Sequence, residues 1–437
     1  MTVSIFLLVF IYVFLFLYSS LLSKGIHGKR FFWFSPIFIC NVYYLVRHYP
    51  ALIDSAVHYD TLRALISVVI AMMGMILSQL LVFRFGPKRY PFHSELSCVR
   101  EQPVKLAIII GMLCVLVVFL FLGRVPIFYL FKGLLGSGAD LAMHEARRMN
   151  TLEHRAGDTV YFGQGYFKFI YLKIAPLFVS CLYVIRRLNK DKLKPVYFLM
   201  FLFLFFSIMN GQIWPMIDML LFFSLVIIGY PYLFELQTVN LNVSRVFWMG
   251  IKILCLVLLL VFLLRYFQSL SGRHFDNFFL DTFRRIYSSD TTVLYNIFPD
   301  NAPYRLGSTW LNDMTGFLPG SVQSFSYEVH YLVHGGAWGF TLSPGLHASA
   351  YVNFGYIGVF LLFFLSYSIY EFFFSKLLKS SKIEYRLMSV VFGVSLAVSL
   401  TADFTSLISP IIYFICIAIS MRLMSAFFGG RRKINLL

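Results

Sequence analysis

The stretch "VSIFLLVFIYVFLFLYSSLL", residues 3–22, consists of twenty residues without a charged side chain. An α-helix of about 20 apolar residues is long enough to cross the hydrocarbon core of a bilayer. No basic segment precedes the stretch and no small-residue cleavage site follows it, as a secretory signal peptide would require. We therefore expect a first transmembrane helix that is retained in the protein.

The composition of the whole chain leads to the same expectation. Hydrophobic residues make up 59% of the 437 residues and charged residues only 13%, with 50 Phe and 27 Tyr. Soluble domains contain about 25% charged residues. The chain is therefore expected to be an integral membrane protein in contact with the lipid bilayer.

Further apolar stretches of similar length follow the first one. They lie near 31–47, 62–84, 105–123, 161–185, 195–210, 212–234, 246–266, 346–374, 386–404 and 406–424. Together they predict an all-α polytopic membrane protein with about eleven transmembrane helices. No soluble domain is visible, so residues 1–437 are expected to form a single integral membrane domain.

The basic residues indicate the topology. Short connections rich in Lys and Arg occupy every second loop, at 23–30, 84–105, 186–194, 376–386 and in the final segment "RRKINLL". The positive-inside rule places these loops in the cytoplasm, so the C-terminus is expected inside and the N-terminus outside a bacterial inner membrane. The net charge of +17 is then mainly a topology signal. Because no basic soluble domain is present, we do not expect nucleic-acid binding.

Two long polar loops, 124–160 and 267–345, fall on the predicted periplasmic side, and the second is large enough to contain short helices. Each carries an arginine pair: Arg147 and Arg148 in "HEARRMNTLEHR", and Arg284 and Arg285 in "FFLDTFRRIYSSD" (278–290). The planar guanidinium group binds phosphate oxygens through two hydrogen bonds and stays charged. These pairs are therefore candidates for holding a diphosphate.

A diphosphate on that face could be the activating group of a sugar donor. ATP and nucleotide sugars are absent outside the cytoplasm, so an enzyme there needs a donor that arrives already activated, such as a lipid-linked pyrophosphate. The alternative is ordinary surface charge. Asp281 precedes Arg284 and Arg285 by three and four residues, which suits a simple helical ion pair.

The histidines in and after the second long loop are candidate bases, because the imidazole titrates near neutral pH. His330 and His334 have the i, i+4 spacing of a metal pair, but no third ligand follows at a recognisable spacing. We therefore expect no metal and no cofactor. His347 begins the next span and is the preferred candidate for a catalytic role, the alternative being a residue that only terminates the helix.

One ionisable residue lies deep in an apolar stretch. Asp218 in "GQIWPMIDMLLFF" is either functional or paired with a cation from another helix, for which Lys168 and Lys173 are the candidates. Arg265 ends the stretch 246–266, where its side chain could extend to the membrane surface. The six cysteines show neither a disulfide pattern nor zinc-ligand spacing.

Three motifs between residues 281 and 360 carry a family resemblance. They are "DTFRRIY", "GSTWLNDMTGFLPG" (307–320) and "AYVNFGYIGVF" (350–360). With the helix layout and the long late outer loop, the chain resembles the oligosaccharide repeat-unit polymerases of the O-antigen polymerase (Wzy) family. This family is related in architecture to the O-antigen ligases.

The resemblance implies a membrane glycosyltransferase that polymerises undecaprenyl-pyrophosphate-linked oligosaccharide repeat units into O-antigen or a similar surface polysaccharide, on the periplasmic face. A sugar hydroxyl of the acceptor would attack the anomeric carbon of the donor, and the pyrophosphate lipid would leave. Arginines would stabilise the developing charge. The resemblance leaves open whether a chain-length regulator binds the protein.

The resemblance also assigns roles to residues of this chain. It implies a catalytic role for Arg284 and Arg285, to which we add His347. The expected pyrophosphate-binding residues are Arg147, Arg148, Arg155, Arg265 and Arg273.

Other functions remain as alternatives. An O-antigen ligase-like transferase is suggested by Gly355-Tyr356-Ile357-Gly358, although His347 lies about one helical turn closer to it than the ligase motif requires. The loop "NGQIWP" also lacks the Gly-x-Arg of many relatives. A lipid-linked oligosaccharide flippase is a transporter alternative, but it would usually have shorter outer loops. A membrane O-acyltransferase is disfavoured because His347 would face away from cytoplasmic acyl-CoA.

Overall fold

The fold was examined in a computed structural model. The structure describes residues 2–28, 31–53, 59–85, 95–122, 167, 169–209, 213–234, 259, 303–315, 325–326, 328–329, 345–400, 404–427 and 431–435.

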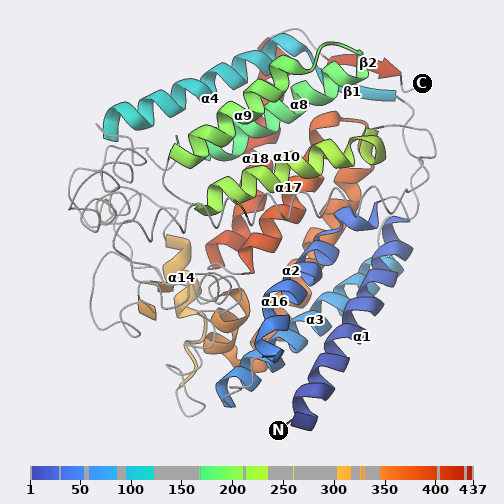
Figure 1. Ribbon diagram of the computed structural model, residues 1–437, viewed down its shortest axis with the longest axis vertical. Helices are drawn as coiled ribbons and strands as arrows, with labels where there is room; N and C mark the ends of the chain where they lie inside the picture. The colour runs from blue at the N-terminus through green and yellow to red at the C-terminus, as the bar shows by residue number, and fades with distance from the viewer. Residues whose placement is uncertain are drawn as a thin grey trace. The chain divides into compact units, whose positions relative to one another are not determined.

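The described residues are mainly helical (Figure 1). The α-helices are α1 (Thr2–His27), α2 (Pro36–Ile53), α3 (Tyr59–Phe85), α4 (Glu101–Leu122), α8 (Ala175–Leu188), α9 (Lys194–Met209), α10 (Ile213–Phe234), α14 (Ser308–Thr315), α16 (Leu346–Leu378), α17 (Ile383–Ser399) and α18 (Phe404–Phe427). A 3-10 helix, η1 (Phe32–Phe34), precedes α2, and a π-helix, η3 (Ile170–Ile174), precedes α8. Two strands complete the described elements, β1 (Glu95–Val99) and β2 (Arg431–Asn435).

The observed helices overlap the predicted transmembrane segments wherever those segments are described. Among the described residues, five helices are long and apolar enough to cross a membrane, within Phe10–His27, Arg63–Phe85, Glu101–Val118, Leu346–Leu378 and Phe404–Leu423. The length and composition of these helices therefore support a helical multi-pass membrane protein. The full set of about eleven spans stays a prediction, because the stretch 246–266 lies almost entirely outside the described residues.

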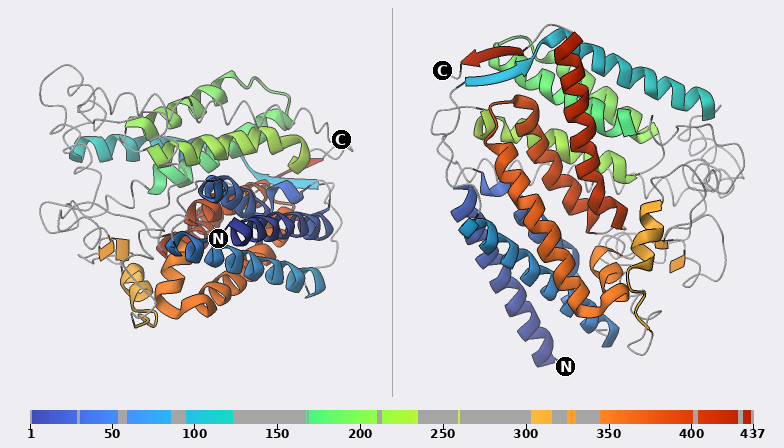
Figure 2. Two further views of the ribbon diagram at one scale, coloured as in Figure 1. Left: turned by 60° about the horizontal axis from the view of Figure 1, so that its bottom comes forward. Right: turned by 180° about the vertical axis from the view of Figure 1, so that it is seen from behind.

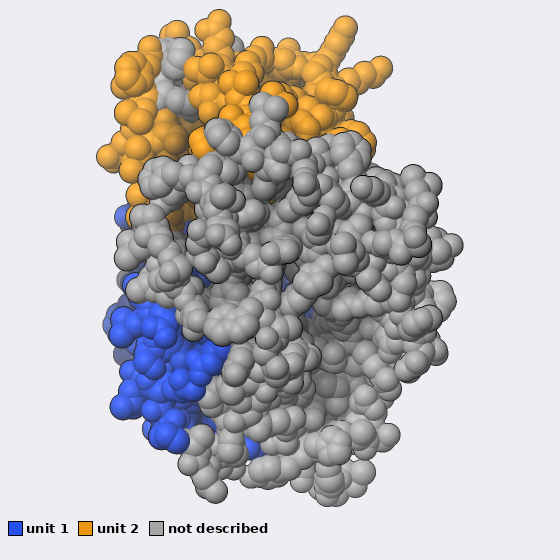
Figure 3. All heavy atoms as spheres, turned by 90° about the vertical axis from the view of Figure 1, so that its left-hand side faces the viewer, with its two compact units in different colours: residues 1–90, 277–377, 392–410 blue, residues 91–276, 378–391, 411–437 orange. Residues whose placement is uncertain are grey.

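The chain forms two compact units, coloured separately in Figure 3. Unit 1 comprises residues 1–90, 277–377 and 392–410, and unit 2 comprises residues 91–276, 378–391 and 411–437.

In unit 1, the helices α1, α2 and α3 pack against one another, and α16 lies against α3. Helix α1 contacts both α2 and α3. Gly74 of α3 permits the close approach of α16, because a Cβ atom at Gly74 would lie 2.8 Å from the carbonyl oxygen of Phe360. Small residues at such crossings let helix backbones approach in membrane proteins. Figure 2 shows these helices running side by side.

In unit 2, α4 packs on α8, and α8, α9 and α10 follow one another as neighbours. Gly111 of α4 lies directly against Ala175 at the start of α8, where a Cβ atom would overlap the alanine side chain. The strands β1 and β2 pair antiparallel, with Glu95 opposite Asn435 and Val99 opposite Arg431. The sequence patterns did not predict this ribbon.

The ribbon and its neighbours bring together four of the basic segments. The amide of Ser97 in β1 donates to the carbonyl of Ser381 at 2.8 Å, which joins 84–105 to 376–386. Arg186 donates to Glu101 at 2.9 Å, which adds the segment 186–194. With β2 from the C-terminal segment, these four connections meet on one side of unit 2, as their common assignment to one side of the membrane predicts. That this side faces the cytoplasm stays a prediction.

Candidate functional site

Two of the three motifs singled out in the sequence meet in unit 1, where α14 docks on the first turns of α16. Asn353 of α16 is the centre of this junction and is fully buried. Its side-chain amide donates to the hydroxyl of Thr309 at 2.5 Å and to the carbonyl of Ser349 at 2.8 Å. Its side-chain carbonyl accepts from the amide of Gly307 at 2.9 Å. One asparagine therefore fastens the start of α14 to α16.

A break in α16 supplies further attachment points. Phe354 and Gly355 leave the helical conformation, and Gly355 has φ 64° and ψ −157°, a backbone conformation that favours glycine. The carbonyl groups just before the break accept hydrogen bonds from the segment that leads into α14. The amide of Arg305 donates to Val352 and the amide of Leu306 donates to Asn353, both at 3.1 Å.

The glycines of the motif Asn-Phe-Gly-x-x-Gly have separate steric roles. A Cβ atom at Gly355 would lie 2.7 Å from the hydroxyl of Tyr304, so a side chain there would displace the segment before α14. A Cβ atom at Gly358 would lie 2.9 Å from the carbonyl of Ala350 and would overlap Phe354. The motif is therefore explained as the set of residues that bends α16 and anchors the preceding segment.

Trp310 and Asp313 secure the buried side of α14. The indole of Trp310 stacks on Phe404 with the ring centres 4.7 Å apart and donates to the hydroxyl of Ser349 at 3.1 Å. Asp313 is buried, and one of its oxygens accepts from the amide of Phe325 at 2.9 Å. These contacts hold α14 as a rigid element within the segment 267–345.

His347, the predicted catalytic histidine, is the second residue of α16 and is only 1% exposed. Its ring meets the ring of Tyr44 edge-on, with the centres 5.9 Å apart. One helical turn further, the hydroxyl of Tyr351 accepts a hydrogen bond from the guanidinium group of Arg63 at 3.1 Å. His347 is thus part of a buried polar group at this end of unit 1, and a substrate would reach its ring only after the surrounding helices moved. Its catalytic role stays a prediction.

Arg63 was not among the predicted site residues. It is buried on α3, within the predicted span 62–84. A charged side chain inside an apolar stretch was the signal that could have identified it, since such residues are rare in membrane helices and usually face a partner or a functional site.

The predicted arginines lie outside the described residues. These are Arg147, Arg148, Arg155, Arg265, Arg273, Arg284 and Arg285. His330 and His334 lie outside them as well. The structure therefore describes α14 and α16, which follow Arg284 and Arg285 in the chain.

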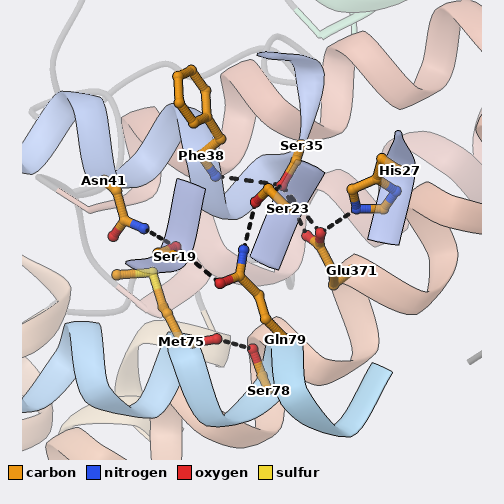
Figure 4. A network of polar contacts seen from close by, with 10 residues as sticks. All are labelled: Ser19, Ser23, His27, Ser35, Phe38, Asn41, Met75, Ser78, Gln79 and Glu371. Carbon is orange, nitrogen blue, oxygen red and sulfur yellow. Dashed lines mark hydrogen bonds and ion pairs between the residues drawn. The ribbon is translucent and has the colours of Figure 1, made fainter. Parts of the chain in front are cut away.

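A second buried polar cluster lies elsewhere in unit 1 (Figure 4). Glu371 of α16 pairs with His27 at the end of α1 and accepts from the hydroxyl of Ser35 at 3.0 Å. On α3, Gln79 donates to Ser23 at 2.6 Å and accepts from Ser19 at 2.9 Å. Asn41 of α2 donates to the hydroxyl of Ser19 at 2.6 Å, so side chains of the cluster link α1, α2, α3 and α16. The sequence analysis missed it, although Ser19, Ser23 and His27 recur every four residues on one helix face.

The predicted pairing of Asp218 is confirmed. In unit 2, the ammonium group of Lys173 lies 3.2 Å from a carboxylate oxygen of Asp218. Lys173 belongs to the π-helix η3 and also lies 5.9 Å from the ring centre of Tyr413. Of the two predicted candidates, Lys173 is therefore the partner.

Metal-ligand geometry was also sought. Within the described part of the chain, no group of three or more His, Cys, Asp or Glu residues is placed to hold a metal ion.

No family model matches this chain, and no curated protein or solved structure matches it either. Its function therefore has to be argued from its own residues and their geometry.

Proposed function

We propose that this protein is a membrane glycosyltransferase that polymerises undecaprenyl-pyrophosphate-linked oligosaccharide repeat units on the periplasmic face, forming O-antigen or a similar surface polysaccharide. The observation that carries the proposal is the junction of α14 with α16. There, two of the three sequence motifs on which the family resemblance depends are joined through Asn353, Thr309 and Gly307.

The junction supports the proposal because it gives the long segment 267–345 a fixed attachment. Arg284 and Arg285 precede α14 in this segment, and transition-state stabilisation requires charged groups that are held in place before the reaction. In the proposed reaction, an acceptor hydroxyl attacks the anomeric carbon and the bond from that carbon to the pyrophosphate oxygen breaks. The hydroxyl proton passes to a base, for which His347 is our candidate, and the arginines stabilise the departing pyrophosphate.

A lipid-linked oligosaccharide flippase is the second candidate, and the pairing of His27 with Glu371 is the observation that favours it. Ionisable groups buried in membrane helices often mark ion pathways in transporters. We prefer the transferase because the motif junction explains residues that a flippase does not require.

A deletion strain distinguishes the candidates by the surface lipid that it makes. Loss of a polymerase leaves surface lipid capped with a single repeat unit. Loss of a ligase-like transferase leaves no attached polysaccharide, and loss of a flippase accumulates the lipid-linked donor on the cytoplasmic side. Only single-repeat capping, restored to long chains by the wild-type gene, agrees with our proposal.

A further inference from the structure

Helix α14 presents two different kinds of side chain on its exposed surface. Leu311 is 66% exposed and Met314 is 45% exposed, and residues three apart lie on the same face of a helix. Asn312 is also exposed, and it lies about 100° around the helix axis from Leu311 and about 160° from Met314. Ser308, exposed as well, lies between Leu311 and Asn312. The opposite side, with Thr309 and Asp313, is buried against unit 1.

The apolar strip continues into the segment before the helix. Leu306 is 75% exposed, and Tyr304 is also exposed. Four large apolar side chains are therefore uncovered between residues 304 and 314. Single exposed apolar residues are common on soluble surfaces, but a contiguous group indicates contact with a partner or a membrane.

The strip is continuous with the outward face of α16. Along α16, exposed apolar residues recur every four positions at Ile357, Leu361, Leu365 and Ile369. This helix is one of those long and apolar enough to cross a membrane, and the row is the apolar face that it would present to lipid when it does. Tyr304, a member of the strip, connects it to this row: a Cβ atom at Gly355, two residues before Ile357, would lie 2.7 Å from the hydroxyl of Tyr304.

We propose that α14 lies at the membrane surface, with Tyr304, Leu306, Leu311 and Met314 in the acyl chains of the leaflet beside the start of α16, and with Ser308 and Asn312 facing water. The occupant of the strip is bilayer lipid, because the strip continues the apolar row that α16 would present to lipid. This inference goes beyond the proposed function, since it does not depend on which reaction the protein catalyses.

Placing fluorescent probes on neighbouring positions tests the proposal. In the full chain with its six cysteines replaced, single cysteines are introduced by Leu311→Cys, Met314→Cys and, as a matched control from the polar side of the exposed surface, Asn312→Cys. Each is labelled with an environment-sensitive fluorophore and reconstituted into phosphatidylcholine and phosphatidylglycerol vesicles at a low protein-to-lipid ratio. Nitroxide-labelled lipid reports acyl-chain contact, and aqueous iodide reports exposure to water.

We expect the probes at positions 311 and 314 to show blue-shifted emission, several-fold stronger quenching by the lipid nitroxide than the probe at 312, and several-fold weaker quenching by iodide. Equal quenching of positions 312 and 314 by iodide would overturn the proposal. Protection of position 311 from both quenchers would also overturn it, because another part of the chain or a second copy would then cover the strip. Two independent positions keep the test decisive if one variant does not fold.

Discussion

The arginine pairs are the residues on which the proposed chemistry depends most directly. At about 4 Å from a phosphate charge, one arginine gains roughly 4 kcal/mol at an effective dielectric near 20, before the cost of desolvation is subtracted. Two or three arginines are therefore enough to favour a departing diphosphate. An exposed pair with a single carboxylate, by comparison, contributes well under about 1 kcal/mol.

We predict that Arg284→Ala, Arg285→Ala and Arg148→Ala stop chain growth while expression stays normal, because each removes a charge from the diphosphate site. Polysaccharide ladders from a complemented deletion strain provide the measurement. The matched control is Arg422→Ala, which removes an exposed arginine near the predicted cytoplasmic end of α18. This variant should leave the ladder unchanged. Wild-type ladders from all three loop variants would exclude the diphosphate site.

His347 raises a different question, because its ring is buried beside Tyr44. We predict that His347→Ala slows glycosyl transfer, measured as the initial rate with lipid-linked repeat units in vesicles. Thermal unfolding of the same preparation separates a loss of chemistry from a loss of packing. An unchanged rate would assign His347 to the packing at the start of α16.

Asn353 is the residue that links the two motifs, and its replacement should act through structure. Asn353→Ala removes three hydrogen bonds and leaves buried polar groups without partners. A loss of about 1–3 kcal/mol in stability is therefore expected, seen as a lower thermal unfolding temperature. Ser368→Ala is the control on the same helix, because its hydroxyl bonds to the carbonyl of Phe364 within α16 itself. Equal stability of the two variants would contradict the anchoring role of Asn353.

At the scale of elements, glycines decide how closely the helices pack. Gly111 of α4 and Ala175 of α8 leave no room for a larger side chain. A Cβ atom at Gly25 of α1, by contrast, would lie at an ordinary contact distance of 3.5 Å from the ring of Phe83. The two glycines therefore differ in what a substitution should do, although both lie inside apolar helices.

We predict that Gly111→Val separates α4 from α8 and lowers stability by about 1–3 kcal/mol, the usual cost of overpacking a tight contact. Gly25→Ala should be neutral or slightly stabilising, because alanine favours the helix more than glycine does. Thermal unfolding in detergent compares the two. A Gly111→Val variant as stable as Gly25→Ala would show that α4 and α8 are not in close contact.

The helices were predictable from the sequence because a transmembrane helix is recorded locally, as a run of apolar residues of sufficient length. The pairing of Asp218 was predictable because a carboxylate in an apolar run needs a cation. The break at Gly355, the π-helix containing Lys173 and the β1–β2 ribbon were not predicted, since each depends on contacts between segments far apart in the chain. Arg63 and Glu371 were missed because their partners come from other helices.

At the scale of the whole molecule, the basic segments give the sidedness a structural basis. Four of them meet through the β1–β2 ribbon, Ser381 and Arg186, so they share one side whichever way the protein is inserted. The positive-inside rule predicts that this side faces the cytoplasm and that the segment 267–345 faces the periplasm.

We predict that a membrane-impermeant thiol reagent added to intact cells with a permeable outer membrane labels a cysteine at position 291 and fails to label one at position 433. After the inner membrane is disrupted, the Lys433→Cys variant should become reactive and the Thr291→Cys variant should stay reactive. Labelling of position 433 in intact cells would reverse the topology and remove the proposed periplasmic reaction.

The contact between His27 and Glu371 also determines the order in which the protein can be completed during synthesis. The two residues are separated by 344 positions, which ribosomes cover in roughly 17–70 s at about 5–20 residues per second. The bond from Ser19 to Gln79 spans only 60 positions and can form much earlier. The newly made α1 therefore stays in the membrane without the partner of His27 until α16 has been translated. One of the last helices to be made supplies the carboxylate that pairs with the first.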